Sequence, residues 1–257
     1  MDAQLGWTHI SRAAVQQAEA QLADESQGVV DELGMLEIHQ GYANRFFPGT
    51  SVLHTRLRYL LFVAWAYESL RHHRGGPPDI AREVAKQERR LGIALKHNTK
   101  GWGLIGRRTL PRMPAQRPSM MYWSALAEWG LLHRHSNGSW PSRAEIHARL
   151  ANAEGHRSLQ DDEGRSLLRY VSPFVQLPPI PHRWPDGAGI DFYLTDEERD
   201  FLRERLGSVH QPGTGRLSLL AKLVNNRAGK RLTENTSLLC EEVHVVAAAD
   251  WPTLPWR

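Results

Sequence analysis

YLLFVAWAY, residues 59–67, is the longest uninterrupted apolar stretch of this 257-residue chain. A helix that is apolar on every face is buried by other parts of the protein on all sides. We therefore expect these residues to be the second half of a helix over residues 52–72, at the centre of the amino-terminal part of the fold. The stretch is far shorter than the roughly 20 apolar residues that cross a bilayer. No association with a membrane is predicted.

Helical periodicity and capping signals recur on both sides of this stretch. Ile80, Val84, Leu91 and Leu95 are spaced so that they share one face of a helix. Ser or Thr followed three residues later by Glu forms a capping box at positions 142 and 195. The sequence thus predicts a mainly α-helical protein, with helices over residues 11–22, 30–44, 52–72, 79–95, 119–129, 142–153, 161–170, 196–206 and 217–225.

The turn and linker signals divide the chain into three parts. Residues 1–117 are expected to form a multi-helical domain that ends in a basic loop rich in glycine and arginine. Residues 118–172 form a helix-hairpin-helix unit, in which Asn137-Gly138 is a typical two-residue hairpin turn. Residues 173–257 open with five of the fifteen prolines. This composition predicts a linker or an extended wrap, followed by carboxy-terminal helices and a tail.

A small winged-helix-like unit is the alternative for residues 118–172. The helix over residues 119–129 would then have to contact base edges, which proteins do with Arg, Lys, Asn or Gln. This segment, SMMYWSALAEW, offers Met, Tyr, Trp and Glu128 instead. We therefore interpret it as a core helix, in a unit that serves packing or non-specific contact with phosphate.

Positive charge is concentrated in the middle of the chain. No Asp or Glu occurs in the 39 residues from Arg89 to Ala127, which carry +8 in a chain whose total is +4. Subtracting +8 from +4 leaves −4 for the rest of the chain. A distribution polarised in this way attracts polyanions. The eight cations are Arg89, Arg90, Lys96, Lys100, Arg107, Arg108, Arg112 and Arg117.

The basic loop, residues 100–118, carries the best candidates for contact with phosphate. Arginine donates from a planar fork that suits phosphate oxygens, and flexible glycines let a loop follow a phosphate backbone. The alternative is that the cations pair with acids brought close by folding, or form a solvated face. Acids available for such pairs are Glu83, Glu88, Asp161 and Asp162. The expected phosphate contacts are Lys100, Arg107, Arg108, Arg112 and Arg117.

The sequence contains no complete catalytic or cofactor-binding motif in the structural context that such a motif requires. Residues 101–106, GWGLIG, match the letters of a dinucleotide fingerprint, but no buried strand precedes them, and Pro111 and Pro114 follow. We interpret these glycines as formers of sharp turns. No HExxH and no paired CxxC motif occurs. The chain is therefore expected to be no enzyme and to use no cofactor and no metal.

The nine tryptophans are many for this length. Most tryptophans of a folded domain lie in its core, because the ring buries a large apolar area. One that stays exposed offers a surface on which bases stack.

Cysteine content and the amino terminus indicate the compartment. Cys240 is the only cysteine, so no internal disulfide forms, as is usual under reducing conditions. The first residues show no basic start followed by an apolar run, and so no signal peptide. We expect a cytoplasmic protein of a bacterium.

Residues 47–59 contain the pattern FPGTS-x3-TRxRY, and shorter blocks accompany it along the chain: Gly6-Trp7, Asp31-Glu32-Leu33-Gly34, Trp65-Ala66-Tyr67, Leu110-Pro111-Arg112-Met113-Pro114, Tyr122-Trp123 and Trp129-Gly130. In these blocks the chain, from residue 5 to about 225, resembles a bacterial family of uncharacterised proteins known only as a domain of unknown function. The resemblance implies a place near DNA-processing and phage-defence genes, and it implies no catalytic residue. It also implies that relatives continue into a further helical region, which makes this chain a short or a truncated form.

Arg56 and Arg58 belong to that pattern and lie at the start of the helix expected over residues 52–72. The amides of a helix N-terminus and two guanidinium groups together can bind an anion. The structural alternative is that both arginines pair with acids of the preceding helix, such as Glu32 or Glu37, because buried charges normally have partners.

The function expected from these observations is that of a non-catalytic, DNA-associated accessory protein in a bacterial anti-phage defence or genome-maintenance module. Its expected ligand is DNA or another polyanion, bound through the basic loop, and its expected partner is a protein of a defence complex. The alternative is a structural or adaptor subunit that docks on a partner protein without contact to nucleic acid.

Overall fold

The chain divides into two compact units, residues 1–42 and residues 43–257. Of the first unit, residues 35–42 are described, and they belong to helix α2. The computed structural model as a whole describes residues 35–100, 102–152, 171–187 and 189–225.

The described residues form eight α-helices and no β-strand, which confirms the predicted mainly α-helical class. The helices expected over residues 11–22 and 161–170 lie outside these residues. The division of the chain at residues 117 and 172 stays a prediction. The helices are α2 (Met35–Phe46), α3 (Tyr59–Glu68), α4 (Pro77–Asn98), α5 (Pro118–Met121), α6 (Trp123–Glu128), α7 (Arg143–Asn152), α9 (Asp196–Gly207) and α10 (Leu219–Asn225).

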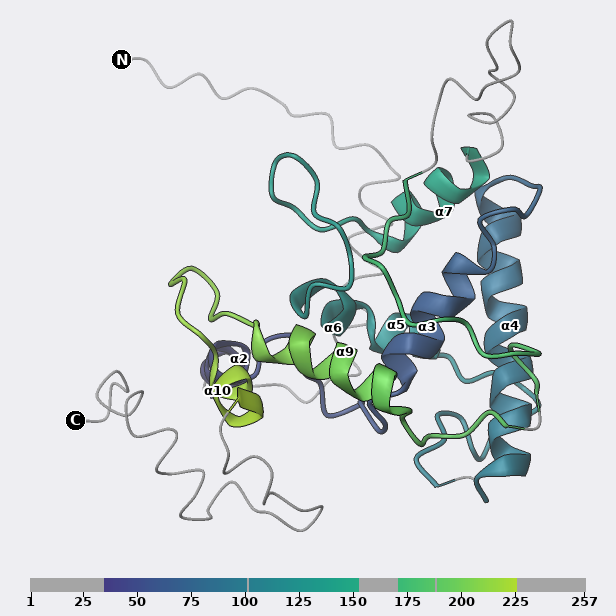
Figure 1. Cartoon of the computed structure of the whole chain (residues 1–257), viewed down its shortest axis with the longest axis horizontal. Coiled ribbons are helices and arrows are strands. Elements are labelled where there is room, and N and C mark those ends of the chain that lie inside the picture. The colour runs from purple at the N-terminus through teal and green to yellow at the C-terminus, as the bar shows by residue number, and fades with distance from the viewer. Residues whose placement is uncertain (1–34, 101, 153–170, 188, 226–257) are drawn as a thin grey trace, which may run out of the picture. The chain divides into compact units, whose positions relative to one another are not determined.

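Helix α3 is the central helix of the second unit. Its first nine residues are all buried, as the apolar sequence predicts. It packs against α4, α5 and α6 (Figure 1). One hydrophobic core includes all of these residues except Ala66, and others as far along the chain as Ala221.

The predicted start of this helix at residue 52 is wrong, because α3 begins at Tyr59. The preceding residues form turns, and their backbone is held by a side chain from a distant segment. The hydroxyl of Tyr122 accepts hydrogen bonds from the N–H groups of Thr55 (2.8 Å) and Arg56 (3.1 Å), and donates one to the carbonyl of Arg56 (2.9 Å). The N–H groups of Thr55 and Arg56 are therefore satisfied by a side chain rather than by a helical hydrogen-bond ladder.

Helix α4 follows the predicted amphipathic pattern. Pro77 is its first residue, and the carboxylate of Asp79 accepts a hydrogen bond from the N–H of Gly76 (2.8 Å), which caps the helix. Ile80, Val84, Leu91 and Leu95 are buried, whereas the basic side chains Arg82, Lys86, Arg89 and Arg90 are exposed. The helix packs against α3 and α7.

The segment expected as one helix over residues 119–129 is two short helices, α5 and α6, with a break at Tyr122. Its interpretation as core is confirmed, because Ala125, Leu126 and Ala127 are buried. The residue at the break, Tyr122, is the one whose hydroxyl hydrogen-bonds to the turn before α3.

The turn predicted at Asn137-Gly138 is present. Gly138 has a φ of 82°, and its N–H donates to the carbonyl of His135 (2.9 Å), while the N–H of His135 donates to the carbonyl of Ser139 (2.9 Å). Among the described residues this turn joins no β-strands. The winged-helix-like alternative for residues 118–172 stays a prediction.

The proline-rich segment is an extended wrap across α3, which we call the strap (residues 171–185) (Figure 1). The indole N–H of Trp65 donates to the carbonyl of Pro178 (2.9 Å). The ring of Trp184 packs against Phe62 and Trp65, with centroid distances of 5.7 and 5.6 Å. The strap is thus part of the core rather than a free linker.

Helices α9 and α10 pack against each other at the end of the described chain. The predicted capping box of α9 is confirmed, since the N–H of Glu198 donates to Thr195 Oγ1 (3.2 Å) and the N–H of Thr195 donates to Glu198 Oε2 (3.1 Å). The capping box at Ser142 and Glu145 is present in front of α7. None of the helices within the described residues has the length and apolar character of a membrane span.

Candidate functional site

The basic loop connects α4 to α5 through turns. Apolar side chains of the loop are buried in the hydrophobic core and fix it there. Leu104, Ile105 and Leu110 are buried, and the N–H of Ile105 donates to the hydroxyl of Tyr59 (3.1 Å). Gly106 has a φ of 74°, as expected for a glycine that forms a sharp turn. The loop therefore presents its polar side chains from an ordered backbone.

The five predicted phosphate contacts lie at the surface of this loop. Lys100, Arg107, Arg108 and Arg112 are exposed. Arg117 is half-buried and precedes the first residue of α5. Within the described residues, no ion pair joins any of the five to a carboxylate.

Two of the acids expected to neutralise the loop have other contacts. Glu83 Oε2 lies 3.3 Å from Lys86 Nζ on α4. Glu88 is buried and accepts a hydrogen bond from the N–H of Ser119 (2.6 Å). Burial raises the pKa of Glu88, and the positive charge of Arg117 partly opposes this rise. The two side chains form no ion pair in the described part of the chain. Asp161 and Asp162 lie outside the described residues.

A cleft of about 760 Å³ adjoins the start of the basic loop, between the end of α4 and the segment that precedes α9. Trp102 is 74% exposed and Tyr193 is 83% exposed, and both rings line the cleft. The side-chain amide of Asn98 donates to the carbonyls of Gly187 (3.3 Å) and Ile190 (2.8 Å), which joins the two walls. The lining residues are Arg56, Asn98, Thr99, Lys100, Trp102, Asp191, Phe192, Tyr193, Leu194 and Arg199.

Arg56 lines this cleft without a carboxylate partner among the described residues. Its guanidinium lies 5.9 Å from the centroid of the Phe192 ring. Its side chain packs closely on Gly103, where an added Cβ would lie 2.4 Å from Arg56 Nε. The structure thus brings Arg56 together with Lys100, whereas the sequence placed the two in separate candidate sites.

Arg58 has a different role from Arg56. It is buried, and its guanidinium contacts Asp191 Oδ1 (2.9 Å), the carbonyl of Asp191 (3.0 Å) and Glu198 Oε1 (2.7 Å). These carboxylates come from the far end of the described chain, whereas the sequence pointed to acids of the preceding segment. Arg58 directly precedes α3, and the first N–H groups of that helix, of Tyr59 and Leu60, donate to the carbonyls of Arg56 (3.2 Å) and Leu57 (3.1 Å).

A comparison with protein-family models places the chain among known sequences. Residues 4–248 match the model of a family of unknown function, DUF6361. The chain belongs to this family. The predicted resemblance to an uncharacterised domain family is thereby confirmed, over more of the chain than expected. Neither the curated proteins nor the solved structures contain a match.

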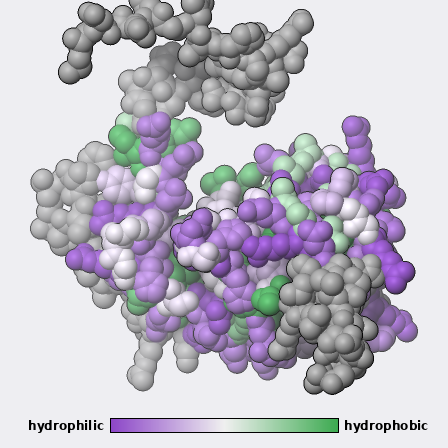
Figure 2. Space-filling model, turned by 90° about the horizontal axis from the view of Figure 1, so that it is seen from above, coloured by the Kyte–Doolittle hydropathy of each residue, from purple (hydrophilic) through white to green (hydrophobic). Residues whose placement is uncertain are grey.

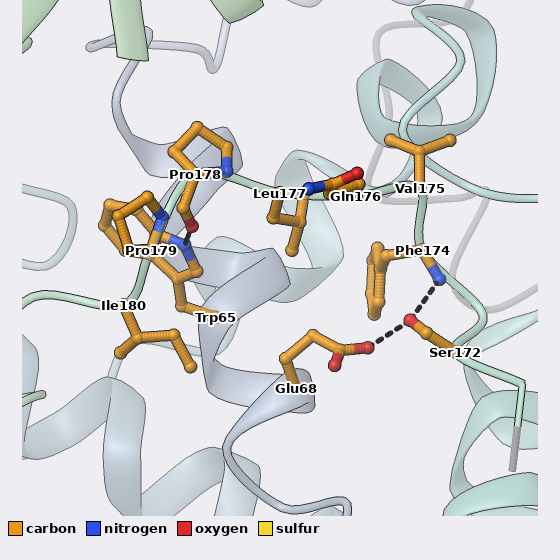
Figure 3. Close-up of a pocket in the computed structure, with 10 residues that line it drawn as sticks. All are labelled: Trp65, Glu68, Ser172, Phe174, Val175, Gln176, Leu177, Pro178, Pro179 and Ile180. Carbon is orange, nitrogen blue, oxygen red and sulfur yellow. Dashed lines mark hydrogen bonds between the residues drawn. The ribbon is translucent and has the colours of Figure 1, made fainter. Parts of the chain in front are cut away.

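A second concavity in this DUF6361 chain lies between α3 and the strap and has a volume of about 310 Å³ (Figure 3). The carboxylate of Glu68 accepts a hydrogen bond from the hydroxyl of Ser172, which in turn accepts one from the N–H of Phe174 (3.0 Å). The remaining lining is largely apolar. This arrangement fixes the strap on α3.

No three His, Cys, Asp or Glu side chains come together as a metal-binding group in the part of the chain that the structure describes. The cleft beside the basic loop is our candidate ligand site, because basic and exposed aromatic side chains line it together.

Proposed function

We propose that this DUF6361 chain is a non-catalytic accessory protein that binds the phosphate backbone of DNA through its basic loop. The observation that carries the proposal is the exposure of four loop cations that have no carboxylate partner within the described residues. Unpaired surface cations in a segment without acids create the local positive field that attracts a polyanion. The four are Lys100, Arg107, Arg108 and Arg112.

The ordered backbone of the loop adds a second argument. A flexible cationic tail loses conformational entropy when it binds, whereas a loop held by buried Leu104, Ile105 and Leu110 has already lost most of it. Arginines presented in this way bind phosphate at a smaller entropic cost. No base-reading helix accompanies the loop in the described residues, so we expect little sequence preference.

Charge reversal in the loop tests the proposal. We expect the variant Arg107→Glu/Arg108→Glu to lose most of its affinity for a labelled DNA duplex, measured by fluorescence anisotropy at low salt. The matched control is Arg203→Glu/Arg216→Glu, which changes the net charge equally at two exposed arginines, one on α9 and one between α9 and α10. Equal loss in both variants would mean that only the total charge matters, and the proposed site would be wrong.

For the biological setting we propose a cytoplasmic bacterial anti-phage defence or genome-maintenance module, in which a protein partner acts together with this chain. The support is the family resemblance alone. Purification of the tagged chain from its native host, with and without nuclease treatment, tests it. We expect the products of neighbouring DNA-processing genes to co-purify, and their absence under both conditions would contradict this setting.

A structural or adaptor role without nucleic acid is the second candidate. It is favoured by apolar side chains between α2 and α3, where Val52 is 97% exposed and Leu53 and Leu57 are also exposed. On the face drawn in Figure 2, by contrast, hydrophobic residues form small patches among hydrophilic ones. If the adaptor role is correct, Val52→Ser/Leu53→Ser abolishes partner capture while the charge reversals in the loop leave it unchanged.

A further inference from the structure

We infer that the cleft between the end of α4 and residues 191–194 binds single-stranded nucleic acid, with unpaired bases stacked on Trp102 and Tyr193. The inference rests on the proposed function, because the basic loop supplies most of the phosphate contacts. It goes further by naming the form of the nucleic acid and the side chains that distinguish it.

Two large aromatic rings are exposed in the lining of this cleft. Trp102 and Tyr193 are 74% and 83% exposed, although they come from separate segments of the chain. Every other tryptophan in the described ranges is buried or half-buried. Soluble proteins usually bury such rings, and exposed ones gathered at one site mark a binding surface. Bases stack on exposed aromatic rings whatever their sequence.

Hydrogen bonds fix both walls of the cleft. On one wall, the hydroxyl of Thr55 donates to the carbonyl of Gly103 (2.6 Å), directly after Trp102. On the other wall, Asp191 Oδ1 accepts a hydrogen bond from the N–H of Tyr193 (2.8 Å) and is itself held by Arg58. A site held in this way binds with less loss of conformational entropy.

Basic side chains surround the two rings in the cleft. Arg56 and Lys100 line the cleft and form no ion pair with a carboxylate among the described residues. Arg199 also lines it and pairs with Asp196. The one lining acid, Asp191, is already paired with Arg58 at 2.9 Å. A ligand in the cleft therefore meets cations and aromatic faces together, the combination that binds single strands.

Stacking on protein rings favours a single strand over a duplex as the ligand. Bases of a duplex are stacked on one another, so their faces are not accessible to a protein ring, whereas unpaired bases are. The cleft volume of about 760 Å³ also falls in the range of pockets that hold small molecules and so admits a base with its sugar. Because Lys100 belongs to both the cleft and the basic loop, a strand that leaves the cleft reaches Arg107 and Arg108 along the same segment.

Anisotropy titrations with labelled oligothymidine and with a labelled duplex of mixed sequence test the inference. We expect wild type to bind the oligothymidine more tightly. Trp102→Ala and Tyr193→Ala should each weaken oligothymidine binding about 5- to 100-fold and leave duplex binding unchanged. Trp102→Phe should retain most of the affinity, since a phenyl ring still stacks. The two side chains are exposed, so we expect the variants to unfold at the same temperature as wild type.

The outcomes separate the inference from the proposed function. If wild type binds neither nucleic acid, both are wrong. If wild type binds, and the two alanine variants keep full affinity or lose affinity for both ligands equally, the stacking cleft is wrong while the phosphate-binding loop stands. The variant Arg107→Glu/Arg108→Glu should weaken binding of both ligands, because phosphates are common to them.

Discussion

Arg58 and Glu198 form a buried ion pair, with Arg58 Nη2 at 2.7 Å from Glu198 Oε1 and side-chain exposures of 7% and 5%. The pair joins the residue before α3 to the first turn of α9, and the second bond of Arg58, to Asp191, fixes a wall of the cleft. The same guanidinium thus stabilises the fold and positions the candidate site.

Removal of one partner of this pair should be costly. Arg58→Met leaves the carboxylate of Glu198 buried without its cation, so we expect the free energy of unfolding to fall by about 3–5 kcal/mol. Urea denaturation followed by circular dichroism measures it. Arg90→Met is the control, because Arg90 pairs with Asp186 at the surface, where such a pair contributes at most about 1 kcal/mol. Equal losses in the two variants would refute the bracing role of Arg58.

Substitution of Gly103 can be compared with substitution of Gly213, because the two glycines have nearly the same φ and differ in the space around an added Cβ. Gly103 and Gly213 have φ values of 70° and 71°, so alanine at either position adopts the left-handed region at a cost of about 1–2 kcal/mol. At Gly213 a Cβ meets nothing within 4 Å, whereas at Gly103 it would meet Arg56 at Nε, Cγ and Cδ. We expect Gly103→Ala to lower the thermal unfolding temperature more than Gly213→Ala.

The same substitution should also alter the cleft, because Arg56 must move away from the added methyl group. Oligothymidine affinity should therefore fall in Gly103→Ala and stay unchanged in Gly213→Ala, under conditions in which both variants are folded. Unchanged affinity in both would show that the position of Arg56 does not matter for binding.

Glu88 predicts a pH dependence of stability. Burial raises the pKa of Glu88 above its ordinary value, and the hydrogen bond from the N–H of Ser119 and the charges of Arg117 and Arg143 oppose this only in part. A carboxyl group whose pKa is higher in the folded state stabilises the fold below its unfolded pKa, and this contribution is lost as the pH rises through the folded pKa.

Glu88→Gln keeps an acceptor for the Ser119 N–H but cannot ionise. We expect its free energy of unfolding, relative to wild type, to increase as the pH is raised from roughly 4 to roughly 8. Urea denaturation across this range measures the difference, with the exposed Glu204→Gln as control. A difference that moves the opposite way would show that the ionised carboxylate is the stabilised form.

Local signals in the sequence predicted the helices well. Capping boxes at Ser142 and Thr195 mark the starts of α7 and α9, and the spacing of Ile80 to Leu95 marks the buried face of α4. These features involve residues within a few positions of each other, so one sequence is enough to find them.

The predicted start of α3 and the predicted partners of Arg58 were wrong because contacts between residues far apart in the sequence determine both. Nothing near residue 52 shows that the hydroxyl of Tyr122 binds the backbone before α3. The acids that hold Arg58 lie more than a hundred residues beyond it in the chain.

The candidate site was found in part. The loop cations were predicted from the run without acids, whereas Trp102 was not singled out among the nine tryptophans. Tyr193 had no signal in the sequence, because its role depends on the fold that brings it to Trp102.

Salt dependence of binding tests the central claim most directly, because each phosphate contact releases counterions. Neutralisation in Arg107→Gln/Arg108→Gln/Arg112→Gln removes up to three contacts, so we expect the slope of log affinity against log salt for oligothymidine to become shallower by about 2, at about 0.7 per contact. Arg203→Gln/Arg216→Gln should leave the slope as in wild type. A wild-type affinity that does not depend on salt, or a slope unchanged by the three loop substitutions, would contradict the account.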